Sequence, residues 1–213
     1  MKALILAGGE LYEPGILRRR IRVESFDIVL GADGGARHVR TLNVTLDAVI
    51  GDLDSLPDSE RTGIDAEIIA YPVEKDETDL ELALLYAGER GASRVVIVGV
   101  IGGRMDMSIA NVLLAAQTGT GSCKIEVWHG EQTGWVIRPP GEVVTGHPGD
   151  TVSLIPLGGG VSGVTTMGLK YSLNDAELRF GSTRGVSNQL EKPSASIKLS
   201  NGLLMVIHTP GRA

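Results

Sequence analysis

The stretch Ala48-Val49-Ile50-Gly51-Asp52-Leu53-Asp54-Ser55 joins a short apolar run to two carboxylates that stand one residue apart. The apolar run predicts a buried strand, and two aspartates directly after its end are directed to one place. Carboxylate oxygens are hard ligands of the kind that Mg²⁺, Ca²⁺ and Mn²⁺ prefer. Asp-x-Asp alone is a weak signal, because Asp54-Ser55 also fits an Asx-type turn. The stretch therefore predicts a strand, and its two acids are candidate metal ligands.

Similar apolar runs recur on both sides of this stretch. They cover residues 3–7, 27–30, 66–70 and 94–100. Helical patterns separate several of them, and the clearest begins with the capping box Thr78-Asp79-Leu80-Glu81. A second helix is predicted over 105–117. Strands that alternate with helices favour right-handed crossovers and a mainly parallel sheet with helices on both faces. We therefore expect an α/β fold with a doubly wound sheet in the N-terminal part of the chain.

The pattern changes near residue 119. The segment Thr118-Gly119-Thr120-Gly121-Ser122 has the composition of a linker. Beyond it, short β-rich runs alternate with Gly and Pro, which predicts an antiparallel all-β sandwich or barrel. The three glycines at 158–160 are most simply a hairpin loop. We expect two domains, an α/β domain over 1–121 and an all-β domain over 122–213.

Composition excludes several classes of function. The net charge of −6 provides no electrostatic footprint for nucleic acid or for an anionic membrane. No apolar run approaches the ~20 residues that span a bilayer. The single cysteine, Cys123, excludes an internal disulfide framework, so a reducing cytoplasm is the simplest expectation. The basic run Arg18-Arg19-Arg20 with Arg22 is more often a solvated face than a phosphate-steering site.

Six aspartates follow the predicted strands of the first domain. Four strand ends carry them: Asp33, Asp52, Asp54, Asp76, Asp79 and Asp106. In a parallel α/β sheet, ligands bind at the carboxyl ends of the strands. Carboxylates that gather at one edge repel each other, so we expect some of them to bind a cation.

The same edge has features that suit phosphate. Gly34-Gly35 and Gly102-Gly103 each precede a predicted helix, and a helix N-terminus offers unpaired amides to an anion. Lys75 and Arg104 add positive charge, and a guanidinium binds phosphate in a bidentate way. Metal, amides and cations around a polyphosphate are the parts of phosphoryl-type transfer.

Each signal also has a simpler structural explanation. Asp33-Gly34 fits a turn, and Asp79 suits the first turn of a helix because of the helix dipole. Gly102-Gly103 fits a close-packed loop, and Arg104 fits a surface ion pair worth less than ~1 kcal/mol. The joint placement at four strand ends favours a metal–phosphate site over these separate explanations.

Together these motifs resemble those of the thiamine pyrophosphokinases, bacterial type. The matching segments of the first half are Asp33-Gly34-Gly35-Ala36, Gly51 to Ser55, Glu74 to Asp79, and Gly102 to Asp106. In the second half they are Gly168 to Leu173, Leu178 to Gly181, and Ser187-Asn188. The resemblance covers nearly the whole chain, and the combination is far more specific than any one segment.

The resemblance implies ATP-dependent transfer of a pyrophosphoryl group to the hydroxyethyl arm of thiamine, which gives thiamine diphosphate and AMP. It implies a homodimer, with 1–121 as the nucleotide- and metal-binding catalytic domain and 122–213 as the thiamine-binding and dimerisation domain. The implied Mg²⁺ ligands are Asp52, Asp54 and Asp79. The implied catalytic set adds Asp76, Arg104 and Asp106. The implied ATP-binding residues are Asp33, Gly34, Gly35, Lys75, Thr78, Gly102, Gly103 and Arg104, and the implied thiamine contacts are Asp106, Tyr171, Ser187 and Asn188.

Two positions depart from the family pattern. Met107 stands where the family often has His or Gln, and Tyr171 stands where animal members have Trp. Tyr171 suits stacking on a cationic ring and equally suits an ordinary strand position. Either Asp76 or Asp106 is expected to accept the proton of the thiamine alcohol. Two other functions remain open at this point, a metal-dependent nucleotide-sugar transferase and a non-catalytic thiamine- or nucleotide-sensing module.

Overall fold

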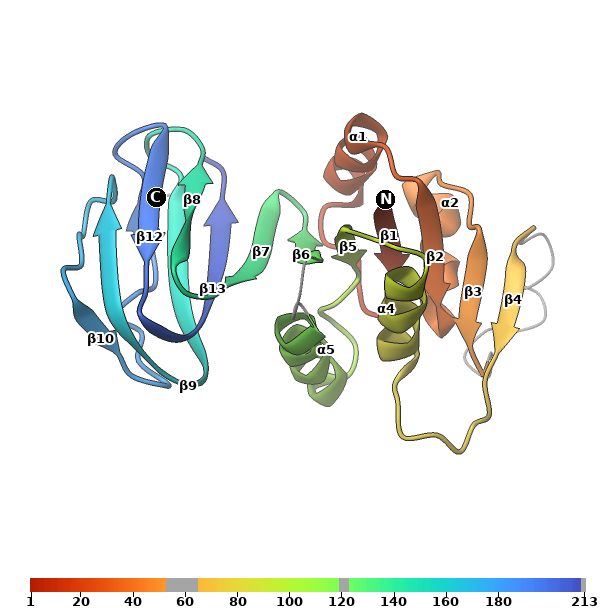
Figure 1. Cartoon of the computed structure of the whole chain (residues 1–213). Helices are drawn as coiled ribbons and strands as arrows, with labels where there is room; N and C mark the ends of the chain where they lie inside the picture. Colours follow the sequence, from red (N-terminus) through yellow and green to blue (C-terminus); the bar gives the residue numbers. More distant parts are fainter. Residues whose placement is uncertain (53–64, 119–122, 212–213) are drawn as a thin grey trace. The chain divides into compact units, whose positions relative to one another are not determined.

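The chain is mixed α/β and divides into two compact units, Met1–Glu131 and Gln132–Ala213. The computed structural model describes residues 1–52, 65–118 and 123–211 (Figure 1). The predicted linker residues 119–122 lie outside the described residues. None of the described helices is long and apolar enough to cross a membrane.

The first unit is built on a parallel sheet with strand order β4-β3-β2-β1-β5-β6. Its strands are β1 (Lys2–Leu6), β2 (Ile28–Ala32), β3 (Ala48–Gly51), β4 (Glu67–Ala70), β5 (Arg94–Val98) and β6 (Lys124–His129). Every neighbouring pair in this order is parallel. Residues 123–128 were expected to begin the second domain. They instead form most of β6, which pairs with β5, so the contact-based division falls after residue 131 and not after residue 121.

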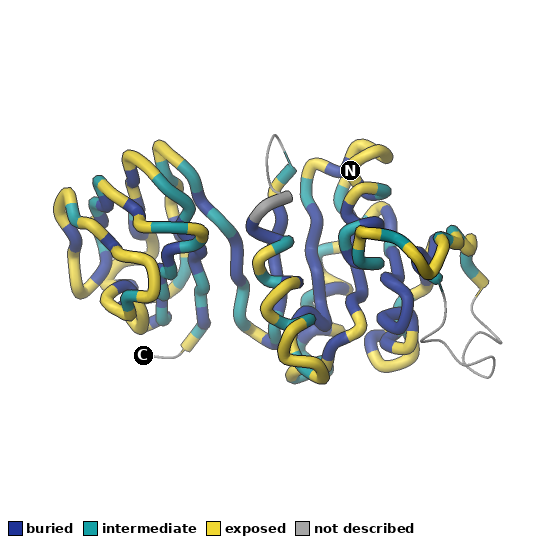
Figure 2. The backbone as a smooth tube through the Cα atoms, turned by 90° about the horizontal axis from the view of Figure 1, so that it is seen from below, coloured by how far each residue is buried: buried dark blue, intermediate teal, exposed yellow. Residues whose placement is uncertain are grey.

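Helices cover both faces of this sheet. The helices are α1 (Pro14–Glu24), the 3₁₀ helix η1 (Asp33–His38), α2 (Val39–Leu42), α4 (Asp79–Glu89) and α5 (Met105–Thr118). Side chains of β1 alternate between two separate cores, because successive residues of a strand point to opposite faces. Ala3 and Ile5 join the core with α4, while Leu4 and Leu6 join the core with α1. The inner strands are accordingly buried along most of their length (Figure 2), whereas the edge strand β4 is largely exposed.

The second unit contains only antiparallel strand pairs among its described residues. Its strands are β7 (Gln132–Ile137), β8 (Gly141–Thr145), β9 (Thr151–Met167), β10 (Ala176–Leu178), β11 (Asn188–Gln189), β12 (Ser194–Lys198) and β13 (Asn201–Thr209). They follow the order β7-β13-β9-β12-β8, and β10 and β11 also pair with β9. They enclose a separate hydrophobic core.

The hairpin predicted at 158–160 was wrong, because these glycines lie inside the long strand β9. Its first part pairs with β13, and its last residues, Thr165 to Met167, pair with β12. Gly158 and Gly163 have φ angles of 67° and 68°, a region that glycine enters without steric cost. The register of β9 against β13 shifts between Leu157, which pairs with Leu203, and Ser162, which pairs with Asn201. The glycines therefore let one strand bend and change partners, as β-bulges do, and they do not reverse the chain.

Candidate active site

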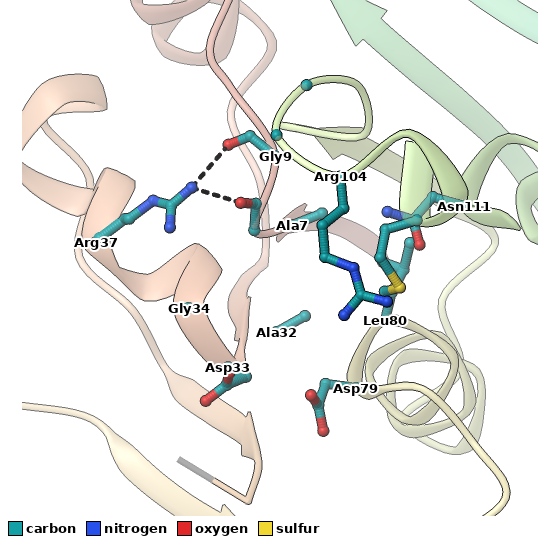
Figure 3. Close-up of a pocket in the computed structure, with 14 residues that line it drawn as sticks. Ala7, Gly9, Ala32, Asp33, Gly34, Arg37, Asp79, Leu80, Arg104 and Asn111 are labelled. Atoms are coloured by element: carbon teal, nitrogen blue, oxygen red, sulfur yellow. Dashed lines mark hydrogen bonds between the residues drawn. The ribbon is translucent and has the colours of Figure 1, made fainter. Parts of the chain in front are cut away.

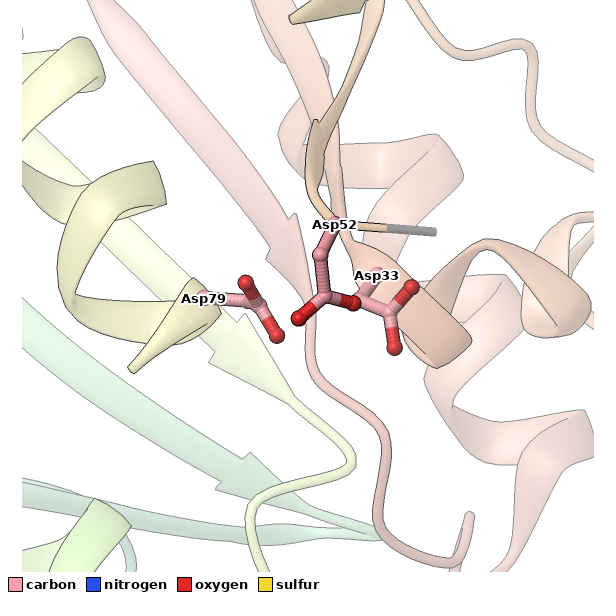
Figure 4. A group of neighbouring side chains, drawn as sticks. All are labelled: Asp33, Asp52 and Asp79. Carbon is pink, nitrogen blue, oxygen red and sulfur yellow. The ribbon is translucent and has the colours of Figure 1, made fainter. Parts of the chain in front are cut away.

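Three aspartates from three elements converge at the carboxyl edge of the parallel sheet (Figure 4). Asp33 is the first residue of η1 and directly follows β2, Asp52 directly follows β3, and Asp79 is the first residue of α4. One carboxylate oxygen of each lies within 4.8 Å of the others. The structure thus brings together three of the six predicted acids.

The backbone explains why these acids meet. β2 and β3 are parallel neighbours, so Asp33 and Asp52 leave adjacent strands at the same edge. Asp33 has a φ angle of 40°, a left-handed conformation that Asp tolerates better than most residues. Gly51 has a φ angle of 148°, and a Cβ there would lie 2.9 Å from Asp33 Cβ and 2.9 Å from Asp79 Oδ1. The absence of a side chain at Gly51 therefore lets the three acids close on one another.

Lys75 is the cation inside this acid cluster. Its Nζ lies 3.0 Å from Asp79 Oδ1 and 3.3 Å from Asp52 Oδ2, and its side chain is 11% exposed. Burial acts to lower the pKa of Lys75, but the hydrogen bonds and charges of Asp79 and Asp52 outweigh it and the pKa is raised. Burial raises the pKa of Asp79. Lys75 opposes this rise, and the charges of Asp33 and Asp52 add to it.

The cluster fits a hard divalent cation. The buried Asp33 Oδ1 has no hydrogen-bond partner among the residues that the structure describes. Three ionised carboxylates and one ammonium leave an excess of two negative charges in a partly buried place. Carboxylate oxygens with no nitrogen or sulfur ligand suit Mg²⁺, which keeps several waters and is usually shared with phosphates. The unpartnered oxygen and the excess charge are both satisfied by such an ion.

A cavity of about 430 Å³ lies beside the acids, and Asp33 and Asp79 form part of its wall (Figure 3). The rest of its wall includes the segments that follow β1 and β5, with Gly8, Gly9 and Gly102 to Arg104. These two strands are neighbours in the sheet, and the strand order changes direction between them. Open α/β sheets bind ligands at this switch point.

Arg37 and His38 hold the Gly8-Gly9 segment of the cavity wall. Arg37 Nη2 donates to the carbonyl oxygens of Gly8 and Gly9 (Figure 3). His38 Nε2 lies 2.8 Å from the Gly9 oxygen, and burial lowers the pKa of His38, so the neutral ring donates this bond. Sequence reasoning missed this pair. The available signal was the glycine pair directly after the first predicted strand.

Arg104 and Asp106 form an exposed bidentate ion pair at the start of α5. Arg104 Nη2 lies 2.6 Å from Asp106 Oδ2, and Arg104 Nε lies 3.1 Å from Asp106 Oδ1. The bond from Arg104, followed by the bond from the Met107 amide, lowers the pKa of Asp106 to about 2. Arg104 lines the cavity, whereas Asp106 is not among the three acids of the cluster.

The other predicted nucleotide-site residues divide into several cases. Asp54 lies outside the described residues. Asp76 lies in the segment between β4 and α4 and is not one of the three clustered acids. Thr78 caps α4, since its Oγ1 accepts a bond from the Glu81 amide at 3.3 Å, as the capping box predicted. Gly34 lines the cavity, while Gly35 packs against the backbone, where a Cβ would lie 1.9 Å from the Leu6 oxygen.

In the second unit, Asn188 positions the backbone around Tyr171. Its Oδ1 accepts bonds from the amides of Tyr171 and Gln189, both at 2.9 Å, and its Nδ2 donates to the Tyr171 oxygen at 2.7 Å. These bonds occupy most of the amide of this buried side chain. Tyr171 is 62% exposed, and Lys170 Nζ lies 5.7 Å from the centroid of its ring. Ser187 is exposed and has a φ angle of 60°.

Two family models match the chain in succession. Residues 21–127 match the catalytic domain of thiamin pyrophosphokinase, and residues 137–204 match its vitamin B1 binding domain. The contact-based division after Glu131 falls between the two matches.

Individual proteins agree with these matches. Thiamine pyrophosphokinase of Bacillus subtilis is 30% identical over 185 residues, which cover 84% of this chain and 86% of that protein. A crystal structure of thiamin pyrophosphokinase from Geobacillus thermodenitrificans has a TM-score of 0.82 and 27% identity, and covers 98% of this chain and 97% of its own. The crystal structure of the Bacillus subtilis protein has a TM-score of 0.85 at 24% identity, covers 99% of each chain and supports the fold. The chain belongs to the thiamin pyrophosphokinase family.

Proposed function

We propose that this protein is a diphosphotransferase that moves a pyrophosphoryl group from ATP to thiamine, which gives thiamine diphosphate and AMP. The observation that carries the proposal is the cluster of Asp33, Asp52 and Asp79 beside a cavity at the switch point of the sheet. ATP is the co-substrate that the family implies. The family assignment does not favour a nucleotide-sugar transferase or a non-catalytic sensing module.

Asp33, Asp52 and Asp79 are the residues that would hold Mg²⁺. The ligand set expected from the sequence was Asp52, Asp54 and Asp79, and the geometry supports adding Asp33, whose buried Oδ1 is unpartnered among the described residues. Asp54 remains a predicted ligand. Bound there, Mg²⁺ supplies positive charge that neutralises the polyphosphate and favours attack on it.

The transfer forms a bond between the thiamine hydroxyl oxygen and the β-phosphorus of ATP. The bond between that phosphorus and the oxygen that bridges to the α-phosphorus breaks, and AMP leaves with that oxygen. Lys75 supplies cationic charge at the acid cluster, Arg104 supplies it at the cavity wall, and the Gly34 and Gly103 segments of that wall supply backbone amides. These groups act by positioning the phosphates and stabilising their charge.

The alcohol proton must pass to a base. Sequence reasoning left Asp76 and Asp106 as candidates. While Arg104 holds it, Asp106 has a pKa of about 2 and is a weak base near neutral pH. This favours Asp76 as the acceptor and gives Asp106 the role of positioning Arg104.

The second unit is the proposed thiamine-binding and dimerisation domain, an all-β sandwich or barrel, and the first unit is the proposed doubly wound catalytic domain. The exposed Tyr171 offers a flat ring face to the cationic thiazolium. Ser187 is a further predicted thiamine contact, and it is exposed in the same unit. Asn188 acts through the backbone bonds that fix Tyr171. We also propose a homodimer in the cytoplasm.

An assay of the purified protein with ATP, Mg²⁺ and thiamine tests this function. We expect AMP and thiamine diphosphate to form in equal amounts, and Asp52→Asn to lower kcat at least about 10²-fold. Thiamine binding without AMP would indicate a sensing module. Release of nucleoside diphosphate from a nucleotide sugar, with none of these products, would indicate the glycosyl transferase.

A further inference from the structure

Asn111 is a polar residue of the cavity wall that the proposed reaction leaves unused. It lies on α5, its side chain lines the cavity, and the residue is 6% exposed. Its Nδ2 donates to the Val100 carbonyl oxygen at 3.4 Å. Its Oδ1 is buried and has no hydrogen-bond partner among the described residues. A buried acceptor without a partner is destabilising, so the site suits a donor that the described residues do not supply.

The orientation of the Asn111 amide follows from its neighbour. The Val100 carbonyl can only accept a hydrogen bond, so Nδ2 faces it and Oδ1 is the unpaired atom. An amide oxygen can only accept as well. Ionised phosphate oxygens and carboxylates therefore cannot satisfy it. The missing partner is a hydrogen-bond donor, for example an amino or a hydroxyl group.

The cavity changes character along its wall. Asp33, Asp79 and Arg104 provide the charged part, which suits a polyphosphate and its cation. Around Asn111 the wall includes the apolar residues Leu80 and Met107. Met107 lies one helical turn before Asn111 on the same face, and its flexible side chain lets the wall adapt to a ligand. This apolar part suits the organic portion of a substrate.

We propose that Asn111 is a specificity-determining residue whose Oδ1 accepts a hydrogen bond from an amino or hydroxyl group of a substrate's organic portion. The inference rests on the proposed function. The donors that the two substrates offer are the exocyclic amino group of adenine, the ribose hydroxyls of ATP, and the amino group of the thiamine pyrimidine. The Nδ2 bond to Val100 fixes which atom of the amide is left to accept a bond.

Substrate analogues that lack one donor each test this assignment. The set is purine riboside triphosphate, 2′-deoxy-ATP, 3′-deoxy-ATP and thiamine without its amino group. The wild type is expected to use one of these about ten-fold less efficiently than the parent substrate, measured as kcat/KM. Leu has a similar volume and no acceptor, so in Asn111→Leu the ratio of kcat/KM for the parent substrate to kcat/KM for that analogue should fall to near one. Asn111→Asp, which keeps an acceptor, should retain the discrimination.

The control is Leu113→Ala, on the same helix, because Leu113 is half exposed and outside the cavity wall. It should discriminate like the wild type. Circular dichroism checks that each variant is folded, and Asn111→Ala replaces the leucine variant if that one is not. Equal use of every analogue by the wild type, or unchanged discrimination in the variants without an acceptor, would overturn the assignment of Asn111.

If the wild type makes no AMP at all, the proposed function is wrong, and this outcome does not itself test the assignment of Asn111. Dissociation constants of the same analogues, measured by calorimetry with wild type and Asn111→Leu, then decide the role of Asn111 without turnover.

Discussion

Gly51 ends β3 directly before Asp52, and its missing side chain decides whether the acids can meet. Its φ angle of 148° is rare for residues with a Cβ, and an added Cβ would lie 2.9 Å from both Asp33 Cβ and Asp79 Oδ1. This glycine belongs to the stretch that contains the Asp-x-Asp motif, but the sequence alone predicted no role for it. Its contribution depends on contacts with residues 18 and 28 positions away, which no local pattern contains.

Gly51→Ala is therefore expected to lower the free energy of unfolding by about 1–3 kcal/mol and to reduce turnover. The matched control is Gly88→Ala in the exposed part of α4, where a Cβ would meet nothing within 4 Å. That substitution should stabilise by about 0.5–1 kcal/mol, because Ala favours the helix. Urea unfolding of both variants checks this, and equal effects of the two substitutions would contradict the role of Gly51.

Ionised Asp79 lowers the stability of the folded protein because of its position in the acid cluster. Its pKa in the folded protein is raised by burial and by its acidic neighbours, despite Lys75. A raised pKa means that the folded state binds this proton more tightly than the unfolded state does. The ionised carboxylate therefore opposes folding when no cation is bound.

Asp79→Asn should accordingly raise the melting temperature of the metal-free protein at neutral pH while it abolishes most activity. The stabilisation should vanish below about pH 4, the range of an ordinary aspartate, where both states are protonated. It should be complete above the raised pKa of the folded state. Thermal unfolding in a chelator from pH 3 to pH 8 measures this, and a stabilisation that grows toward low pH would contradict the sign.

Among the helices and strands, those that depend on local sequence patterns were predicted correctly. The five strands β1 to β5 and the cap of α4 coincide with apolar runs and with a capping box. The prediction of a hairpin inside β9 was wrong because glycines that bend a strand look the same in sequence as glycines that reverse it. Arg37 and Asn111 were missed, since a single polar residue on a helix has no motif and gains its role only from the opposite wall of the cavity.

Helix α4 carries Asp79 on its first residue, so its cap matters for the site. Thr78→Ala removes the bond that the Glu81 amide donates to Thr78 Oγ1 and is expected to cost about 1 kcal/mol of stability. It should also weaken Mg²⁺-dependent turnover, since the end of the helix frays. Thr78→Ser keeps the hydroxyl and should restore both properties. Urea unfolding and steady-state kinetics give the comparison, and a serine variant as weak as the alanine variant would contradict capping as the cause.

At the scale of the whole molecule, the chain consists of two units with separate cores, and each contains one of the two tryptophans. Trp128 lies in the first unit and Trp135 in the second, and both are buried. β6 has the composition of the β-rich half but pairs with the parallel sheet, so the structural division follows Glu131, whereas the sequence predicted a boundary after residue 121. Only the pairing reveals to which unit the strand belongs.

The two tryptophans report on the units separately. In single-tryptophan variants, Trp135→Phe and Trp128→Phe, Mg²⁺ with ATP should raise the unfolding midpoint seen by Trp128 more than the midpoint seen by Trp135. Ligand at 100 times its Kd stabilises the unit that binds it by about 2.7 kcal/mol. Fluorescence-detected unfolding measures both midpoints. A larger shift at Trp135 would indicate that the nucleotide binds to the second unit and would contradict a nucleotide site in the first.

The cation site that Asp33, Asp52 and Asp79 are proposed to form is the basis of pyrophosphoryl transfer to thiamine. Its most direct test is the Mg²⁺ dependence of AMP formation in wild type and Asp33→Asn, because Asp33 joins the site only through the fold. We predict that Asp33→Asn needs at least about ten-fold more Mg²⁺ for half-maximal rate, in the range typical when a metal site is perturbed. An unchanged Mg²⁺ dependence together with unchanged turnover in this variant would contradict the account.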